Sequence, residues 1–285
     1  MTGCNEATLS DLTQWVGREE LRNDRIDQRI AQALAATLDL DPDTFEEGAP
    51  LPPLWHWVYF TPNARGSEIG CDGHPTRGGF LPPVDLPNRM WAGGRLSFEQ
   101  PLRVGEAVSR VSRIVRCERK TGRNGELVFV TVKHTVSGER GVCVVEEQDI
   151  VYRRPAAKGA ALAGTAVEGS AGFRQRIHPD PVLLFRYSAL TFNAHRIHYD
   201  KPYATQEEGY PGLVVHGPLA ATLLLQAFRA AHPDKRIRRF EFRAVGPLFD
   251  TEDFDVCGQL TGPTSADLWV DCEGRQTMKA DVTFD

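Results

Sequence analysis

The chain has 285 residues, of which 41% are hydrophobic and 25% charged, and its formal net charge is −5 at pH 7. These values are typical of a globular protein long enough for two ordinary domains. Because no hydrophobic run approaches the roughly 18 residues of a membrane-spanning helix, we expect a soluble protein with no membrane partner. The negative net charge also argues against a nucleic-acid partner.

Cysteine usage and the amino-terminal composition indicate the cell compartment. The six cysteines are widely spaced and never form a C-x-x-C pair, which favours reduced thiols over a disulfide framework. The first thirty residues contain several acidic side chains and no hydrophobic segment, so neither a secretory signal nor a mitochondrial transit peptide is expected. We therefore expect a cytoplasmic protein.

The sequence of the first half predicts a helix followed by strands. Residues 24–39 carry Ile26, Ile30, Leu34 and Leu38 four apart, which predicts an amphipathic helix. A Pro/Gly-rich passage at residues 73–94 follows. Alternating hydrophobic residues then predict strands within residues 108–116, 127–136 and 142–152.

The second half repeats this order. Residues 155–172 are mostly small and predict a linker, after which a helical section at 183–229 precedes four predicted strands at 238–242, 254–260, 268–272 and 279–284. The amino-acid sequence of residues 95–114 also resembles that of residues 239–260. We interpret the chain as a duplicated domain, with units at 1–154 and 173–285 joined by a linker at 155–172.

Each copy would form an α+β unit in which an antiparallel sheet lies around a helix. The two copies could also share one continuous sheet. The alternative is a pair of unrelated α+β domains.

The stretch YSALTFNAHRIHYDKPYA, residues 187–204, is the main candidate for a functional loop. Asn193 ends a helix-compatible segment, and Pro202 disfavours helix at Lys201, so His195 and His198 are expected on a short irregular segment between helices. Such segments often carry functional side chains. Asn193 could also simply cap the following turn.

A long hydrophobic helix is predicted to begin at Gly217-Pro218 and to end near Ala231. Because leucines and alanines cover nearly its whole circumference, this helix should be buried. Its amino terminus offers unpaired backbone N–H groups and a positive partial charge. The Gly217 N–H is therefore a candidate donor to an oxyanion.

These two segments resemble the motif of the MaoC-like, hotdog-fold enoyl-thioester hydratases, D-x-N-P-x-H-x-D followed by an H-G-x-L helix start. Aligning His198 with the motif histidine places Asn193 at the usual aspartate, His195 at the usual asparagine and Arg196 at the usual proline. These departures resemble the branch that includes mesaconyl-C4-CoA and itaconyl-CoA hydratases and the type 2 hydroxyacyl-thioester dehydratases. Residues 72–94 resemble the first hotdog of that branch, so the resemblance covers nearly the whole chain.

The resemblance implies a double hotdog, in which a curved antiparallel sheet wraps a long helix in each half. It implies a degenerate first half without the catalytic loop, so the chemistry is expected after Arg174. It further implies an acyl-CoA thioester as the binding partner, no cofactor, and a homodimer as an expected assembly.

Hydration of an enoyl thioester needs a base for the water, an acid for the α-carbon and donors to the thioester oxygen. His198 is the candidate proton carrier. Asn193 could hold the water but cannot act as a base, so His198 would act alone or with help from His195 or a carboxylate elsewhere. His216 could contact the substrate or only pack near the helix start.

The implied substrates are dicarboxylic, and their free carboxylate needs a cation. Arg186, Arg196 and Lys201 flank the motif, and we prefer Arg196 because it replaces the usual proline beside the reacting atoms. Arg77 and His74 of the first half could line the same pocket. An ordinary surface role is the alternative for each of these residues.

Three functions remain open from the sequence. They are a C4-dicarboxylic enoyl-CoA hydratase, a dehydratase of fatty 3-hydroxyacyl thioesters, and a non-catalytic hotdog that binds acyl thioesters. A zinc site at His195, His198 and His216 is not expected, because neither H-E-x-x-H nor a paired Cys/His spacing accompanies these residues.

Overall fold

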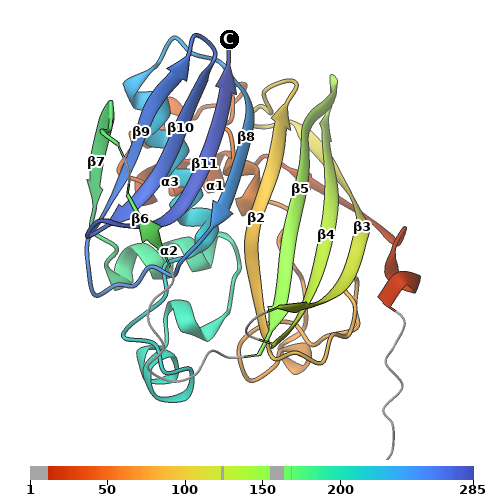
Figure 1. Ribbon diagram of the computed structural model, residues 1–285. Coiled ribbons are helices and arrows are strands. Elements are labelled where there is room, and N and C mark those ends of the chain that lie inside the picture. The colour runs from red at the N-terminus through yellow and green to blue at the C-terminus, as the bar shows by residue number, and fades with distance from the viewer. Residues whose placement is uncertain (1–11, 123–124, 155–163, 168) are drawn as a thin grey trace, which may run out of the picture.

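The computed structural model describes residues 12–122, 125–154, 164–167 and 169–285. A single antiparallel sheet of 11 strands runs through both halves of the chain in the order β1-β3-β4-β5-β2-β8-β11-β10-β9-β7, with β6 paired to β11. Figure 1 shows this sheet curving around the helices α1 and α3. The possibility of a continuous sheet is therefore confirmed.

The first half contributes β1 (Glu19–Arg25), β2 (Asn88–Phe98), β3 (Ala107–Gly122), β4 (Gly125–Gly138) and β5 (Gly141–Arg153). The second half contributes β6 (Thr165–Ala166), β7 (Phe173–Ile177), β8 (Ile237–Ala244), β9 (Phe254–Gly262), β10 (Ser265–Cys272) and β11 (Arg275–Phe284). The helices are α1 (Gln28–Thr37), α2 (Pro181–Leu190) and α3 (Gly217–Ala231). No helix in the described ranges is long and apolar enough to cross a membrane.

The seam between the halves is the pairing of β2 with β8, from Gly93 opposite Arg243 to Ser97 opposite Arg239. At Gly93 a Cβ atom would lie 2.4 Å from the Phe242 carbonyl oxygen. A glycine is therefore needed there for the two backbones to approach, as is common at bends and bulges within sheets.

The helices fill the concave side of the sheet. Helix α3 is buried along nearly its whole length, as its sequence predicts, and it packs against β7, β9 and β10. Helix α1 buries Ala31, Leu34 and Ala35 on one face. Each half thus lays an antiparallel sheet over a helix, although α1 has only 10 residues and α3 has 15.

The predicted start of the first helix at residue 24 is wrong. Residues 19–25 form β1, which pairs with β3, and the helix begins at Gln28. The Asp27 side chain caps it by accepting hydrogen bonds from the Arg29 and Ile30 N–H groups at 2.9 and 3.3 Å. The side chain of Asp24, the first residue of the predicted helix, instead accepts a hydrogen bond from the Phe60 N–H at 2.6 Å.

The predicted strands all exist, and most extend beyond their predicted bounds. The sequence does not predict the first part of β2, residues 88–94, because this stretch belongs to a passage rich in proline and glycine. In the structure these residues are a strand, because hydrogen bonds to β5 on one side and to β8 on the other outweigh their weak strand propensity. Of the predicted linker, residues 155–163 and 168 lie outside the described ranges, and residues 165–166 pair with β11.

The loop around Gly73 in the first half docks on the motif loop of the second half. Arg196 ties the two loops together, because its backbone N–H donates to the Asp72 carbonyl at 2.9 Å and its guanidinium donates to the Cys71 carbonyl at 3.0 Å. A Cβ atom on Gly73 would lie 1.7 Å from the Ala194 carbonyl oxygen. Gly73 also has φ +91°, which favours glycine for a second reason.

This contact predicts that Gly73→Ala separates the two loops and destabilises the protein. The matched control is Gly48→Ala, because Gly48 has a similar φ of +84° but a Cβ atom there would meet nothing within 4 Å. Overpacking costs about 1–3 kcal/mol, so thermal unfolding should show Gly73→Ala less stable than the control by roughly that amount. Equal stabilities would contradict the close contact.

Candidate active site

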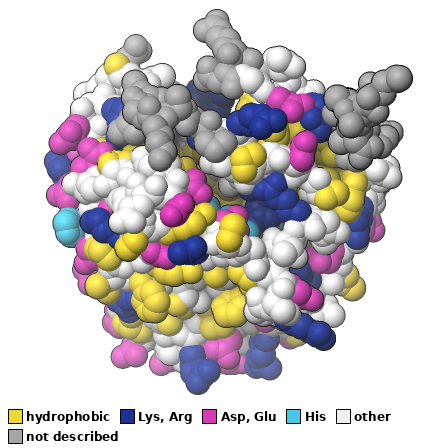
Figure 2. Space-filling view, turned by 90° about the horizontal axis from the view of Figure 1, so that it is seen from below, with side chains coloured by type: hydrophobic (Ala, Val, Ile, Leu, Met, Phe, Trp, Pro, Cys, Tyr) yellow, Lys and Arg dark blue, Asp and Glu magenta, His cyan; other side chains and the backbone are white. Residues whose placement is uncertain are grey.

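Two neighbouring cavities lie where the loops of both halves meet. The larger has a volume of about 1340 Å³ and the smaller about 390 Å³. His74, Arg77 and Arg89 of the first half line both of them. Figure 2 shows this face hollowed near its middle, with cationic and hydrophobic side chains around the hollow. Such a concave, mainly apolar space with a few polar groups is typical of a small-molecule site.

The motif loop follows α2 directly. His195 and His198 lie on a short irregular segment that contains one 3-10 turn, Arg196–His198, as the sequence predicts. The Asn193 side-chain oxygen accepts a hydrogen bond from the His195 N–H at 3.1 Å. Asn193 therefore caps this turn and also lines the larger cavity.

Four imidazole rings form a row that crosses from one half to the other. The centroid of His74 lies 4.0 Å from that of His195, which lies 5.4 Å from that of His198. His198 in turn stacks on His216 with centroids 3.7 Å apart. The fold therefore gathers the three histidines singled out around the motif and adds His74 from the first half.

His198 is a neutral imidazole with a defined tautomer. Its Nδ1 lies 2.7 Å from the Val214 carbonyl oxygen, so Nδ1 carries the proton and donates it, which leaves a lone pair on Nε2. Burial lowers the pKa of His198 to about 4. The side chain is 8% exposed and lines neither of the two cavities, whereas its stacking partner His216 lines the larger one.

His216 is the residue immediately before α3 and is 1% exposed. Its Nε2 lies 2.8 Å from the Ser188 hydroxyl oxygen, while its buried Nδ1 has no hydrogen-bond partner among the described residues. Burial holds the pKa of His216 well below its usual value. A buried polar nitrogen without a partner on a cavity wall is a natural contact for a bound water or ligand.

The amino terminus of α3 reaches the same cavity. His216 and Pro218, on either side of Gly217, both line it. Within the described part of the chain the Gly217 N–H meets no backbone or side-chain acceptor, and Pro218 has no N–H to offer. The helix dipole adds positive partial charge at this point, which favours a negatively charged group there.

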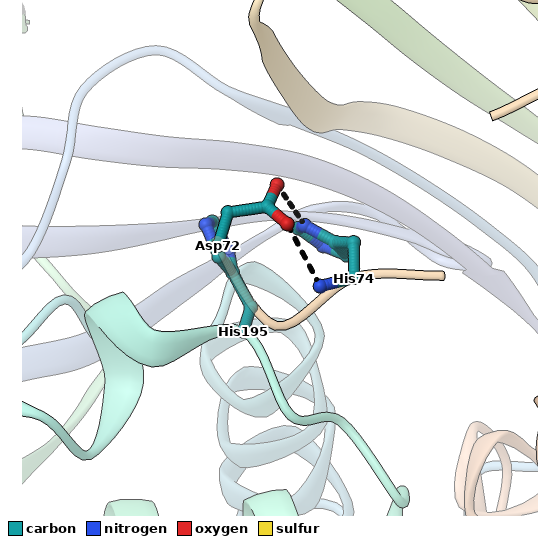
Figure 3. A group of neighbouring side chains, drawn as sticks. All are labelled: Asp72, His74 and His195. Carbon is teal, nitrogen blue, oxygen red and sulfur yellow. Dashed lines mark hydrogen bonds and ion pairs between the residues drawn. The ribbon is translucent and has the colours of Figure 1, made fainter. Parts of the chain in front are cut away.

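Asp72 and His74 form a hydrogen-bonded pair against His195 (Figure 3). Asp72 accepts from the His74 backbone N–H at 2.9 Å, and its other oxygen lies 3.0 Å from His74 Nδ1. Although desolvation opposes it, these hydrogen bonds hold the pKa of Asp72 well below its usual range. Ligand atoms of Asp72, His74 and His195 all lie within 4.8 Å of one another, which is also compatible with a metal ion.

The arginines favoured from the sequence are largely engaged elsewhere. Arg196 forms an ion pair with Asp200 at 2.8 Å and lies over the Tyr203 ring at 4.1 Å. Arg186 is exposed and lines neither cavity. Arg77 lines both cavities, but its guanidinium donates to three backbone carbonyls, those of Val84, Leu86 and Pro87.

Arg89 is a further cation on both cavities, and the motif pattern in the sequence did not indicate it. It lies at the start of β2, lines both cavities and lies close enough to Tyr152 to oppose the rise in the pKa of that hydroxyl caused by burial. No carboxylate in the described ranges lies within ion-pair distance of it. It stands in the stretch LPNRMWAGG, within the residues that resemble the first hotdog of the family, and that resemblance gave it no role.

Comparisons with known proteins identify the family. The model of the hydroxyacyl-thioester dehydratase type 2 family matches residues 54–250. Mesaconyl-C(4)-CoA hydratase of Chloroflexus aurantiacus is 49% identical over 258 residues, which are 89% of this chain and 90% of that protein. The mitochondrial hydroxyacyl-thioester dehydratase type 2 of Schizosaccharomyces pombe is 30% identical over 78% of this chain and 80% of that protein.

Solved structures agree on the fold. A MaoC-like dehydratase superposes with a TM-score of 0.72 at 15% identity, over 96% of this chain and 98% of that one. A Mycobacterium tuberculosis protein described as a double hotdog has a TM-score of 0.61 at 12% identity, over 94% of this chain and 96% of that one. The expected α+β double hotdog is confirmed, and the chain belongs to the hydroxyacyl-thioester dehydratase type 2 family.

Proposed function

We propose that this protein is a hydro-lyase that reversibly adds water to a C4-dicarboxylic enoyl-CoA, either mesaconyl-C4-CoA or itaconyl-CoA, to give citramalyl-CoA. The supporting observation is Arg89, a cation without a carboxylate partner in the described ranges, on the cavity that also meets the amino terminus of α3. The 49% identity to a mesaconyl-C(4)-CoA hydratase supports the same reading.

The thioester would bind with its oxygen at the amino terminus of α3. Attack by water at the β-carbon pushes the electrons of the double bond onto that oxygen, and the Gly217 N–H together with the helix dipole stabilises the resulting enolate. A cavity of about 1340 Å³ is larger than a C4 acyl group needs, so it has room for part of the pantetheine arm as well.

Arg89 would bind the free carboxylate of the substrate. In mesaconyl-C4-CoA that carboxylate is attached to the β-carbon, so the cation must lie beside the carbon that water attacks. Carboxylates line both cavities, Asp72 and Glu208 the smaller one and Glu20 and Asp24 the larger one. Arg89, which lines both cavities, would hold the substrate carboxylate where they meet.

His198 would accept a hydrogen bond from the attacking water through Nε2, because Nδ1 is committed to the Val214 carbonyl. His195 lies between His74 and His198 and would orient both rings, and His216 would contact the substrate or water through its unpartnered Nδ1. Asn193, which caps the turn, can offer only its amide group to the cavity. The motif of this chain therefore lacks a carboxylate base at position 193.

We also propose a cytoplasmic location and a homodimeric assembly. Cys71, Cys117, Cys143, Cys257 and Cys272 are unpaired, which fits a reducing compartment such as the cytoplasm. We further propose that residues 1–154 and 173–285 are the two duplicated units and that two copies of the chain form a homodimer.

The reaction is tested by following the absorbance of the enoyl thioester with mesaconyl-C4-CoA, itaconyl-CoA and crotonyl-CoA. Crotonyl-CoA is the control, because it is a four-carbon enoyl thioester without a carboxylate on the β-carbon. One charged hydrogen-bonding interaction is worth about 1.5–3 kcal/mol, so kcat/KM should favour the diacid by roughly 10- to 100-fold. Equal turnover would refute the diacid specificity, and turnover of none would favour a binding module.

Arg89→Gln should abolish this preference. Removing the guanidinium should lower kcat/KM for mesaconyl-C4-CoA by about 10- to 100-fold and leave crotonyl-CoA turnover nearly unchanged, because only the diacid loses a charged partner. Arg89→Lys tests whether charge alone suffices. The control Arg29→Gln, at an exposed position on α1, should leave both rates unchanged. A parallel loss on both substrates would contradict a role in carboxylate recognition.

His198→Ala should lower kcat by roughly two to four orders of magnitude, as expected for loss of the imidazole that accepts a hydrogen bond from the attacking water and so helps its deprotonation. Circular dichroism and thermal unfolding should first establish that the variant folds, because the ring is buried against His216. A folded variant that retains near wild-type turnover would remove His198 from the mechanism.

A further inference from the structure

The motif loop lacks a carboxylate where hydration chemistry usually has one. Position 193 is an asparagine, and its side-chain oxygen already accepts from the His195 N–H. Addition of water still requires a group that removes a proton from that water. A second basic group must therefore reach the cavity from another part of the chain.

His74 has the properties of such a group. It comes from the first half, lines both cavities and has a side chain that is 19% exposed. Its Nδ1 pairs with Asp72 at 3.0 Å, and its Nε2 has no hydrogen-bond partner among the residues that the structure describes. When Nδ1–H donates to the carboxylate, Nε2 carries a lone pair that faces no competing donor.

The position of His74 is fixed from both sides. Asp72 accepts from its backbone as well as from its ring, and the loop is held on the motif loop by Arg196 and by the close approach of Gly73 to Ala194. The His74 ring lies against His195 at 4.0 Å. A base held this firmly by its surroundings is preorganised for proton transfer.

We propose that His74 is a catalytic residue of the hydration reaction, the base that takes the proton of the attacking water, and that Asp72 is its positioning residue. This inference rests on the proposed function. The first half of the duplicated chain then supplies both the base and, through Arg89, the cation, while the second half supplies the oxyanion donor.

The step balances in protons and electrons. His74 Nε2 takes one proton from water as the water oxygen bonds to the β-carbon, and the electron pair of the double bond moves to the thioester oxygen. The enolate then reforms the thioester carbonyl as its α-carbon takes the proton back from the His74 imidazolium. One water is consumed, and His74 ends neutral.

Arg89 fits this scheme because in mesaconyl-C4-CoA the β-carbon carries the carboxylate. The base and the cation must then flank the same carbon. His74 and Arg89 line the same two cavities, and Arg89 lies close enough to lower the pKa of His74.

The charges around His74 set the expected pH dependence. Burial is the main influence and lowers the pKa of His74, Asp72 raises it, and Arg89 and Arg77 lower it. His195, the other titratable group in contact, is itself held neutral, because burial lowers its pKa to about 2. A base works in its neutral form, so activity should fall only as the pH drops through the depressed pKa of His74, below its usual value of about 6.5.

The test uses the full-length protein with mesaconyl-C4-CoA. His74→Ala should lower kcat by about 10²- to 10⁴-fold with a smaller change in KM, and imidazole added to the buffer should restore part of the activity. His74→Gln, which can keep the hydrogen bond to Asp72, should be as inactive as His74→Ala. The matched control is His178→Ala, which removes an exposed histidine paired with Asp253 in the same way and should leave kcat unchanged.

Asp72→Asn separates positioning from mere packing. The amide oxygen can still accept from His74 Nδ1, but the negative charge that raises the pKa of His74 is gone. The acid limb of the kcat profile should therefore move to lower pH, and the plateau should fall because the base is weaker. If Asp72 had a purely structural role, the substitution would lower the amount of folded protein but would not shift the acid limb of the kcat profile.

Each outcome bears on the proposal. If the wild-type protein hydrates none of the three thioesters, the proposed function fails and this inference with it. If the wild type is active but His74→Ala and His74→Gln both stay within about threefold of it, only this inference fails. It also fails if EDTA abolishes the wild-type activity and Zn²⁺ restores it, because Asp72, His74 and His195 would then act as metal ligands.

Discussion

The close approach of Gly73 to the Ala194 carbonyl is the contact on which the site depends. Only a residue without a Cβ atom allows the two backbones to lie this near, and the hydrogen bonds of Arg196 hold them there. This contact brings His74 of the first half against His195 of the second. Two copies of one fold thereby form a single site, which neither copy could form from its own residues.

Desolvation determines how charge is distributed around this contact. Burial lowers the pKa values of His74, His195, His198 and His216, so the row of rings is neutral at physiological pH. A charged row would repel Arg89 and would compete with it for the substrate carboxylate. Because the row is neutral, the cations that line both cavities are Arg77 and Arg89. The Arg77 guanidinium is bound to backbone carbonyls, which leaves Arg89 as the cation for the substrate. The charge of Arg89 is then balanced mainly when a dicarboxylic substrate is bound.

The sequence could predict what depends on local pattern. The strands of β3, β4 and β5 follow from alternating side chains, and helix α3 and the motif loop follow from residues close together in the chain. The carboxylate-binding arginine could not be found this way, because Arg196 was chosen for its place beside the motif and the fold pairs it with Asp200 four residues on. Arg89 and Asp72 lie more than a hundred residues before the motif, and only the docking of the loops shows that they reach it. For the same reason the first half, expected to lack chemistry, is the source of the proposed base and cation.

The asparagine at position 193 has a physical explanation in this arrangement. An aspartate there would add a further negative charge to the wall of the larger cavity, beside the proposed site of the substrate carboxylate, and Coulomb repulsion in a partly desolvated space would weaken binding. Asp72 avoids that cost because His74 donates two hydrogen bonds to its carboxylate, and because His74 lines the larger cavity whereas Asp72 does not. A neutral imidazole can remove a proton from water without presenting an anion to the diacid. Moving the base to the first half and leaving an amide in the motif therefore reconciles proton abstraction with recognition of a negatively charged acyl group.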